Sequence, residues 1–205
     1  MNRHVGLHVL LGAAIAVPLL VAGSALVRAQ APLAVDTARI TISGTSNIHA
    51  YTASTTAVRV TRAQLAGPVE GSDIWTAALR AGGVEAFEVA IPAASLSSPR
   101  EGLDKNMHKA LKAEQFPEII FRLSRIEGTP EAPIAVGKLR IAGVEREVAL
   151  MLKTQRRDAA LVVTGSLPLL MTDYGIKPPT ALLGMLKTDP KVTVSFETVL
   201  AVPLT

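Results

Sequence analysis

Apolar and polar residues alternate along most of this chain with a period of two. The alternating segments carry Ile, Val, Leu or Phe at most of their second positions, and they occupy residues 40–43, 86–91, 118–124, 137–141, 147–153, 161–169 and 192–200. This pattern is typical of antiparallel strands with one dry face and one wet face. Together with a further strand expected within 48–60, it predicts about eight strands.

One segment follows a helical period instead. Leu103, Met107, Ala110 and Leu111 fall at spacings of four, seven and eight residues, which places them on a single apolar stripe. The chain is therefore expected to contain one short amphipathic helix. A single helix among many strands favours a mainly β fold with a flanking helix over an α/β enzyme.

The residues around this helix predict its limits. Ser98 is followed by Pro99 and then by Glu101, which is the form of a capping box with proline at the first helical position. Pro117 has no amide hydrogen and biases Phe116 towards an extended conformation, so the helix is expected to end before Phe116.

A short turn at residues 142–144, Ala-Gly-Val, is expected to join residues 137–141 and 146–152 as a hairpin. About eight antiparallel strands can form either a closed barrel or a sandwich, and the period of the pattern does not separate the two.

The dry faces are free of charge and mostly branched aliphatic. The whole chain contains only one Trp, two Tyr and four Phe. A barrel of about eight strands can be filled by its own side chains or can hold one small ligand. An ordinary packed core and an apolar cavity both fit the pattern, although medium-sized side chains leave more room than large rings.

The N-terminus has the form of a secretory signal peptide. Arg3 precedes an apolar run from Val5 to Val27, and Ala29 ends a short stretch that suits signal peptidase. We expect cleavage after Ala29, giving a signal peptide at 1–29, one domain at 30–205 and a periplasmic or secreted protein. The alternative is a retained membrane anchor, since the apolar run is long enough to span a bilayer.

The basic character of the chain lies partly in this signal. The sequence has 21 Lys and Arg against 17 Asp and Glu, and removing Arg3 and Arg28 leaves 19 against 17, a net charge of +2. Like charges do not run beyond pairs, so a nucleic-acid partner is not expected. With no cysteine in the sequence, disulfides and a lipoprotein anchor are excluded.

Candidate catalytic and metal-ligating residues are few. Beyond the signal, the histidines are His49 and His108, and no nucleophile elbow, zinc-protease, phosphate-loop or dinucleotide motif occurs. His49 is expected to cap a turn or a strand end, His108 to lie at the surface, and Trp75 to pack in the core or at a sheet edge. No catalytic residue, metal or cofactor is therefore expected.

Five segments, in order, resemble a known family. They are S-G-T-S-N-I-H at 43–49, L-D-K-N-M at 103–107, F-P-E-I-I-F at 116–121, G-K-L-R-I-A-G-V-E-R-E-V at 137–148 and M-T-D-Y-G-I-K-P-P-T-A-L-L-G at 171–184. On this set the chain resembles the YceI-like family of exported lipid- and polyisoprenoid-binding proteins, from about residue 40 to residue 202. The resemblance implies a single antiparallel lipocalin-like β-barrel with a helical element.

One segment departs from the family pattern. Many members carry Arg-Asp-x-His-Leu on the helix, where this chain keeps Asp104 but has Leu103 and Asn106 in place of the basic residue and the histidine. A head-group preference is therefore not carried over from the relatives.

The resemblance implies that the barrel takes up an isoprenoid or acyl chain of a long-chain amphiphile. Ligand-binding residues are expected on the dry strand faces, the helix and the segment after residue 170: Phe87, Val89, Met107, Leu111, Phe116, Ile119, Phe121, Leu139, Ile141, Met171, Tyr174 and Phe196. Tyr174 is the one that can offer a hydroxyl at the mouth of the barrel, and its alternative role is packing on the wall.

The expected partner is this lipid, with only peripheral contact to membrane lipids, and pairing of two barrels into a homodimer is left open. Two other functions remain as alternatives. The first is an envelope interaction module with a filled barrel. The second is an enzyme, which needs a histidine within reach of Asp104, a serine or Tyr174 in a cleft.

Overall fold

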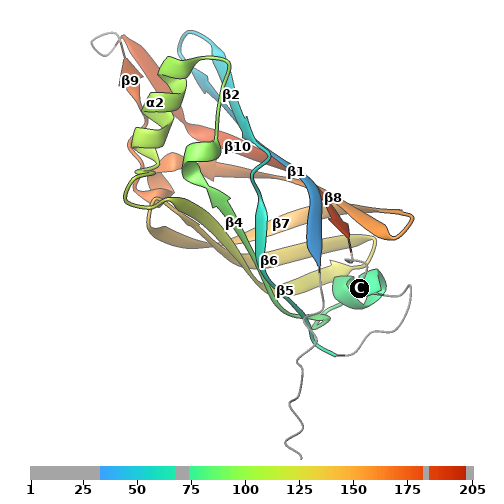
Figure 1. Cartoon of the computed structure of the whole chain (residues 1–205). Coiled ribbons are helices and arrows are strands. Elements are labelled where there is room, and N and C mark those ends of the chain that lie inside the picture. The colour runs from blue at the N-terminus through green and yellow to red at the C-terminus, as the bar shows by residue number, and fades with distance from the viewer. Residues whose placement is uncertain (1–32, 68–73, 182–184, 202–205) are drawn as a thin grey trace, which may run out of the picture.

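The computed structural model describes residues 33–67, 74–181 and 185–201, and Figure 1 shows a curled sheet with helices at both ends. The predicted signal peptide at 1–29 lies outside these residues. The strands are β1 (Ala34–Ser46), β2 (Ala50–Thr55), β3 (Arg59–Leu65), β4 (Val84–Pro92), β5 (Glu118–Thr129), β6 (Ala132–Ile141), β7 (Val144–Arg157), β8 (Ala160–Leu170), β9 (Thr180–Ala181) and β10 (Leu186–Ala201). The helices are α1 (Ile74–Leu79), η2 (Ala93–Ser95), α2 (Glu101–Ala110) and η3 (Met171–Tyr174).

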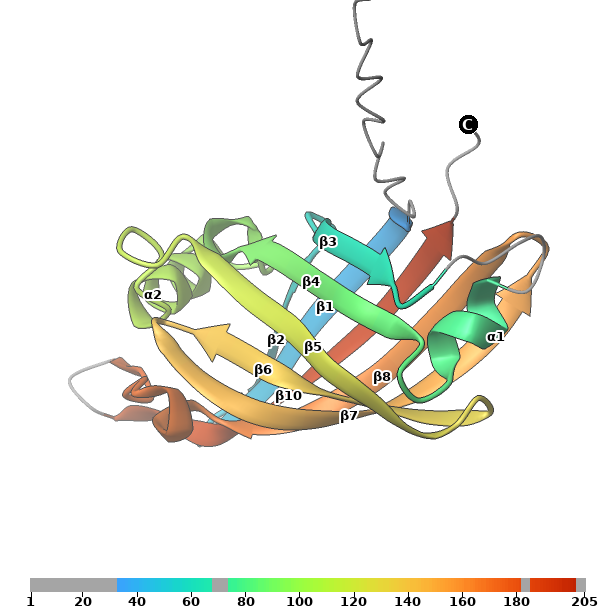
Figure 2. The same cartoon turned by 90° about the horizontal axis from the view of Figure 1, so that it is seen from below.

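All strand pairs are antiparallel and belong to one sheet, in the order β2-β1-β10-β8-β7-β6-β5-β4-β3, with β9 paired to the start of β10. The sheet curls, so that β4 and β5 pass in front of β1 and β10 when the molecule is seen from below (Figure 2). The predicted mainly β, antiparallel, lipocalin-like fold is confirmed. The strand count is slightly higher than the eight expected.

The two edge strands of the sheet are consecutive in the chain. Only residues 56–58 separate β2 from β3, so one stretch of backbone runs from the β1 edge to the β4 edge. The edge strand β2 gains a further partner from the segment after η2: Ser54 and Ser97 exchange two backbone hydrogen bonds of 2.8 and 3.0 Å. This contact covers part of an otherwise unpaired edge.

The hairpin between β6 and β7 confirms the turn predicted at 142–144. Ile141 pairs with Val144, and the two residues between them, Ala142 and Gly143, have φ of 49° and 83°. Two central residues with positive φ match the right-handed twist of the flanking strands. Gly143 also accommodates the ring of Phe116, since a β-carbon built on it would lie 2.5 Å from Phe116 Cζ.

The predicted helix forms, but the capping box does not. Arg100 is the N-cap residue, with extended backbone and no side-chain cap, and α2 begins at Glu101. Ser98 instead accepts a hydrogen bond from the Arg100 amide at 3.1 Å, and its own amide donates to Asp104 Oδ1 at 2.8 Å. The serine therefore stabilises the approach to the helix, because the extended Arg100 moves the start of the helix beyond the reach of a box.

A second short helix, α1, was not predicted. Its six residues are too few for a helical period to be recognised in the sequence, and its stability must come from packing. The side chain of Trp75 is 3% exposed, and its Nε1 donates to the carbonyl oxygen of Ala159 at 3.0 Å. Trp75 packs with Leu33, Leu161 and Val163.

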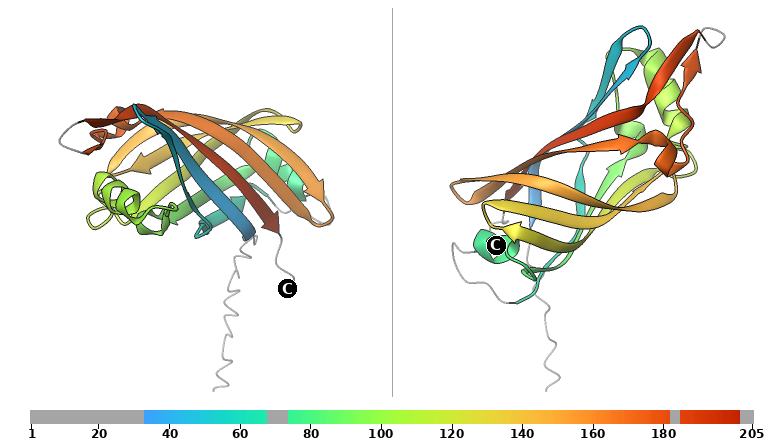
Figure 3. Two further views of the ribbon diagram at one scale, coloured as in Figure 1. Left: turned by 90° about the horizontal axis from the view of Figure 1, so that it is seen from above. Right: turned by 180° about the vertical axis from the view of Figure 1, so that it is seen from behind.

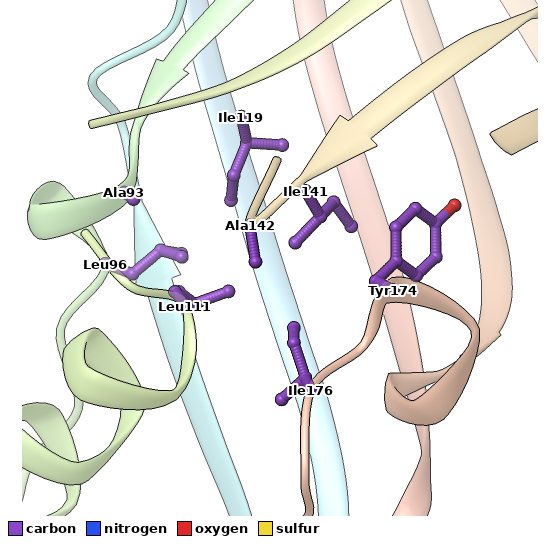
Figure 4. Packing of buried hydrophobic residues seen from close by; sticks show 8 residues of the cluster. All are labelled: Ala93, Leu96, Leu111, Ile119, Ile141, Ala142, Tyr174 and Ile176. Atoms are coloured by element: carbon purple, nitrogen blue, oxygen red, sulfur yellow. The ribbon is translucent and has the colours of Figure 1, made fainter. Parts of the chain in front are cut away.

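Buried apolar residues gather at both ends of the sheet. At the α1 end lies the cluster around Trp75. Near α2 lies a larger one whose members come from η2, β5, β6, η3 and the segments next to them, including the residue after α2 (Figure 4). Figure 3 shows α1 and α2 at opposite ends of the molecule. The larger cluster consists of Ala93, Leu96, Leu111, Ile119, Ile141, Ala142, Tyr174 and Ile176. The two clusters leave the middle of the curled sheet between them.

Candidate ligand-binding cavity

A cavity of about 520 Å³ runs through the interior of the curled sheet. The side chains around it come from the inner faces of β1, β4, β5, β6, β7, β8 and β10 and from α1, α2 and η3. This volume lies within the range of small-molecule binding sites. The sequence pattern left open a packed core and an apolar cavity. The unfilled interior favours the cavity, because a packed core would leave no such space.

The cavity is closed at the α1 end and open at the α2 end. Leu33, Trp75 and Leu161 line the α1 end, and all three are buried. The exposed lining residues include His49 in the β1–β2 turn and Arg100 before α2. The β1–β2 turn and α2 lie at the same end of the molecule in Figure 1, so the mouth opens between them.

A β-bulge keeps the long strand β5 apolar on its inner side. Ile119, Phe121 and Leu123 line the cavity at odd positions, but the next lining residue is Ile126. The register with β6 shifts between Leu123 and Arg125, which inserts one extra residue and changes which positions face inward. The strand therefore stays apolar inside along its whole length.

Two phenylalanine rings lie along the wall of the cavity because glycines face them. A β-carbon built on Gly165 would lie 2.5 Å from Phe196 Cζ, and one built on Gly137 would lie 2.7 Å from Phe121 Cζ. Such overlap is possible only for glycine, so the rings cover the glycine backbone as in aromatic rescue of strand glycines. The rings are thus kept close to the sheet instead of crossing the cavity.

The structure places most of the predicted ligand-binding residues around the cavity. These are Phe87, Val89, Met107, Leu111, Ile119, Phe121, Leu139, Ile141, Met171, Tyr174 and Phe196. Phe116 is not among the lining residues that the structure describes. Its ring covers Gly143 at the β6–β7 turn, where it helps to hold the hairpin against the end of α2.

Tyr174 packs in the wall instead of standing at the rim. Its side chain is 3% exposed within the larger cluster, as Figure 4 shows, and its hydroxyl has no hydrogen-bond partner among the described residues. Burial raises the pKa of Tyr174, Asp173 raises it further, and Arg146 acts in the opposite direction. The hydroxyl therefore stays protonated at neutral pH.

The polar residues at the mouth were not predicted from the sequence as ligand contacts. Ser46, Tyr51, Arg100 and Asn106 line the cavity there together with His49. Three of them lie in or beside the β1–β2 turn, Arg100 directly precedes α2, and Asn106 lies in the middle of that helix. The only sequence signal for them was their position next to predicted element ends, where chain segments from distant parts of the sequence can meet.

The two histidines have different roles. His49 Nε2 lies 2.8 Å from Arg100 Nη1 at the mouth. His108 Nε2 lies 2.7 Å from the carbonyl oxygen of Leu96, to which it must donate, and the residue is half-buried instead of lying on the surface as expected. His108 thus ties α2 to the loop before it.

Neither a metal site nor a membrane-spanning helix is found in the part of the chain that the structure describes. His, Asp and Glu side chains there do not gather in groups of three or more that could hold a metal ion. No helix in the same ranges is long and apolar enough to cross a bilayer.

The outer face of the sheet is charged, in contrast to the cavity. Arg122 contacts Glu88 at 2.5 Å and Glu145 at 3.6 Å, across β4, β5 and β7. Burial acts to raise the pKa of Glu88, but hydrogen bonds from Thr61 and Arg122 and the charges of Arg122 and Arg140 outweigh it, so the pKa is lowered.

A curled antiparallel sheet around an apolar cavity places the molecule among the lipocalin-like folds. Residues 33–200 match the YceI-like domain, and the chain belongs to this family. The family resemblance found in the sequence motifs is thereby confirmed. No protein with a curated description matches the chain.

Solved structures share the fold at low sequence identity. BcnA of Burkholderia cenocepacia superposes with a TM-score of 0.64 at 15% identity, covering 79% of this chain and 95% of that one. A polyisoprenoid-binding domain from Saccharophagus degradans, implicated in plant cell wall breakdown, gives a TM-score of 0.61 at 12% identity, with coverage of 83% and 98%. The Campylobacter jejuni YceI protein gives 0.50 at 14% identity, with coverage of 69% and 82%. At these identities the likeness concerns the fold alone.

Proposed function

We propose that the protein is an exported, non-enzymatic carrier that sequesters a long-chain amphiphile, either a polyisoprenoid or a fatty-acyl lipid. The observation that carries this proposal is the chemistry of the cavity, which is lined almost entirely by apolar side chains and has its one charged lining residue, Arg100, at the open end. An amphiphile has the same division into tail and head. The description of the Saccharophagus degradans relative as a polyisoprenoid-binding domain supports the same assignment.

The energetics favour tails of medium or greater length. A chain of roughly fifteen carbons gains about 12 kcal/mol from burial at about 0.8 kcal/mol per methylene. Association costs at least about 4 kcal/mol. At most about 8 kcal/mol remains, which corresponds to roughly micromolar binding. Transfer of the tail from water therefore suffices without any covalent chemistry.

The polar groups near the mouth support binding over catalysis. His49 contacts the guanidinium of Arg100, His108 contacts a carbonyl oxygen, and Asp104 accepts a hydrogen bond from the Ser98 amide. The two histidines and Asp104 are thus each engaged by a partner other than the one that catalysis needs. The cavity likewise counts against the filled-barrel interaction module.

Native mass spectrometry of protein purified from the periplasm tests the ligand. We expect a bound lipid that organic extraction releases and that competes with a fluorescent fatty probe. A protein that carries no lipid and does not bind the probe would refute the carrier function.

The same preparation tests export. The predicted cleavage after Ala29 gives a mature chain that begins at Gln30, and intact-mass measurement identifies this species in the soluble periplasmic fraction. The full-length mass in the membrane fraction would instead support the retained anchor.

A further inference from the structure

We propose that the mouth of the cavity selects amphiphiles with an oxyanion head, a carboxylate or a phosphate monoester, through Arg100 and His49. This inference rests on the proposed function and names the head group of its ligand. Among the described residues that line the cavity, Arg100 is the only charged one, and none is an aspartate or a glutamate. A ligand head at the mouth therefore meets one positive charge and no negative charge from the lining.

The guanidinium of Arg100 has donors to spare. A guanidinium carries five N–H groups and no acceptor, so in its 2.8 Å contact the Nε2 atom of His49 must accept, and the imidazole proton lies on Nδ1. In the described part of the chain, this is the only side-chain hydrogen bond of Arg100, and no carboxylate lies within 4.0 Å of it. Arg122 and Arg125, by contrast, are each paired with two glutamates.

Both residues are held in place by serine-stabilised turns. Ser98 Oγ accepts from the Arg100 amide at 3.1 Å and donates to its carbonyl oxygen at 3.0 Å. Ser46 Oγ accepts from the His49 amide at 3.1 Å and donates to its carbonyl oxygen at 2.9 Å. The backbone on both sides of the mouth is therefore ordered before a ligand arrives, which lowers the entropic cost of binding.

Tyr51 adds a neutral donor to the same mouth. It lines the cavity on β2, two residues beyond His49. Burial raises the pKa of Tyr51 and Asp189 raises it further, so its hydroxyl is protonated at neutral pH and can donate to an anion. A planar guanidinium fork suits carboxylate and phosphate oxygens, and its positive charge disfavours a cationic head.

A set of four amphiphiles with the same tail tests the head-group preference. The compounds are palmitate, hexadecyl phosphate, hexadecanol and hexadecyltrimethylammonium, each used below its micellar concentration. The affinity of the mature chain for each compound is measured by displacement of a neutral fluorescent lipid probe. We expect the two anions to bind roughly tenfold more tightly than hexadecanol, as one charge-assisted contact allows, and the cation to bind most weakly. The order of the two anions distinguishes a carboxylate source from a phosphate source.

The variant Arg100→Gln separates the contribution of the ligand head group to the binding affinity from that of the tail. We expect this variant to bind both anions roughly tenfold more weakly and hexadecanol with unchanged affinity. Arg100→Lys keeps the charge without the fork, so it should fall in between. The matched control is Arg157→Gln, which removes the same charge from an exposed position at the opposite, α1 end of the barrel and should change none of the four affinities.

The outcomes distinguish the two proposals. If none of the four compounds displaces the probe from the natural chain, the carrier function itself is wrong. If hexadecanol binds as tightly as palmitate and Arg100→Gln changes neither, the carrier function stands and the head-group site is refuted. Loss of hexadecanol binding in folded Arg100→Gln, checked by circular dichroism, would assign Arg100 a structural role and also refute the site.

Discussion

Phe196 on β10 lies over Gly165, its cross-strand partner on β8. Its ring occupies the space that a β-carbon at position 165 would need. Both residues face the cavity, because residues paired directly across two strands share a face. Phe121 on β5 likewise lies over Gly137 on β6, although Gly137 is paired with Leu123, two residues further along β5. Two of the largest inner side chains thus occupy space that neighbouring glycines vacate, and the cavity keeps its width.

Gly165→Ala is expected to displace the ring of Phe196 into the cavity. The added β-carbon would meet Phe196 Cζ at 2.5 Å and the Met151 carbonyl oxygen at 3.0 Å. Overpacking of this kind lowers the free energy of unfolding by about 1–3 kcal/mol. Urea denaturation measures this loss, and displacement assays with a series of fatty acids should show weaker binding of long chains than in the natural protein.

Gly67→Ala is the matched control, because no atom of the described residues lies within 4 Å of a β-carbon at that position. Its unfolding free energy should change by no more than about 0.5 kcal/mol. Unchanged binding of long chains by folded Gly165→Ala would show that the glycine does not set the width of the cavity.

Phe196→Asp and Ser195→Asp test the inside and outside assignment of β10 at adjacent positions. Phe196 lines the cavity, whereas Ser195 is exposed on the outer face. An unpaired carboxylate in the apolar interior should cost several kcal/mol and abolish folding or lipid binding. The same charge at Ser195 should change stability by less than about 1 kcal/mol. Phe121→Asp is expected to act as Phe196→Asp does. Equal effects at 195 and 196, measured by thermal unfolding, would contradict this assignment.

Trp75 is expected to report how far a tail reaches. It is the only tryptophan of the chain and lines the closed end of the cavity, so its emission depends on what occupies that end. Saturation with a fatty acid long enough to fill the cavity should shift or quench the fluorescence, whereas a saturating short-chain homologue held near the mouth should not. Equal responses to both chain lengths would mean that the tail does not run from the mouth towards α1.

Stability at low pH should depend on Glu88. Its pKa in the folded protein lies below the usual value of 4.5, so its contribution to stability is present above that value and is lost as the pH falls through the lowered pKa. Glu88→Gln should lower the unfolding free energy by about 0.2–1 kcal/mol at pH 7, as expected for a partly exposed ion pair.

The difference between Glu88→Gln and the natural protein should vanish once Glu88 is protonated in both the folded and the unfolded states. Urea denaturation at several pH values from 7 downwards measures it. A difference that is the same at pH 7 and in strong acid would mean that the carboxylate charge makes no contribution.

The fold could be predicted from the sequence because its strands alternate so regularly. Phe121, Leu139 and Phe196 were assigned to the inner face from period-two spacing alone, and the structure places them around the cavity. The β6–β7 hairpin was predictable for a similar local reason, since Gly143 adopts the positive φ that such turns require. Prediction from the sequence succeeds at positions where the local backbone preference and the packing in the folded protein favour the same type of residue.

Features that depend on contacts distant in sequence could not be predicted in this way. Trp75 lies in a helix too short for a recognisable period, and its indole is fixed by a carbonyl 84 residues away. Arg100 and His49 meet only because the first hairpin and α2 come to the same end of the sheet. Phe116 was assigned to the ligand from its place beside the helix, but Gly143 offered its ring a better packing position.

The short connection at residues 56–58 has a mechanical consequence for the molecule. The two edges of the sheet are joined there by covalent backbone, and no ladder of hydrogen bonds joins β3 to β1 or β2 among the described pairings. The seam can therefore part beside β3 without breaking interstrand bonds, whereas the bonds between Ser54 and Ser97 hold it on the β2 side. Widening the curled sheet therefore costs less free energy than lengthening its cavity. A tail bearing methyl branches or double bonds can spread the wall sideways, while the indole at the far end still limits how deep it goes.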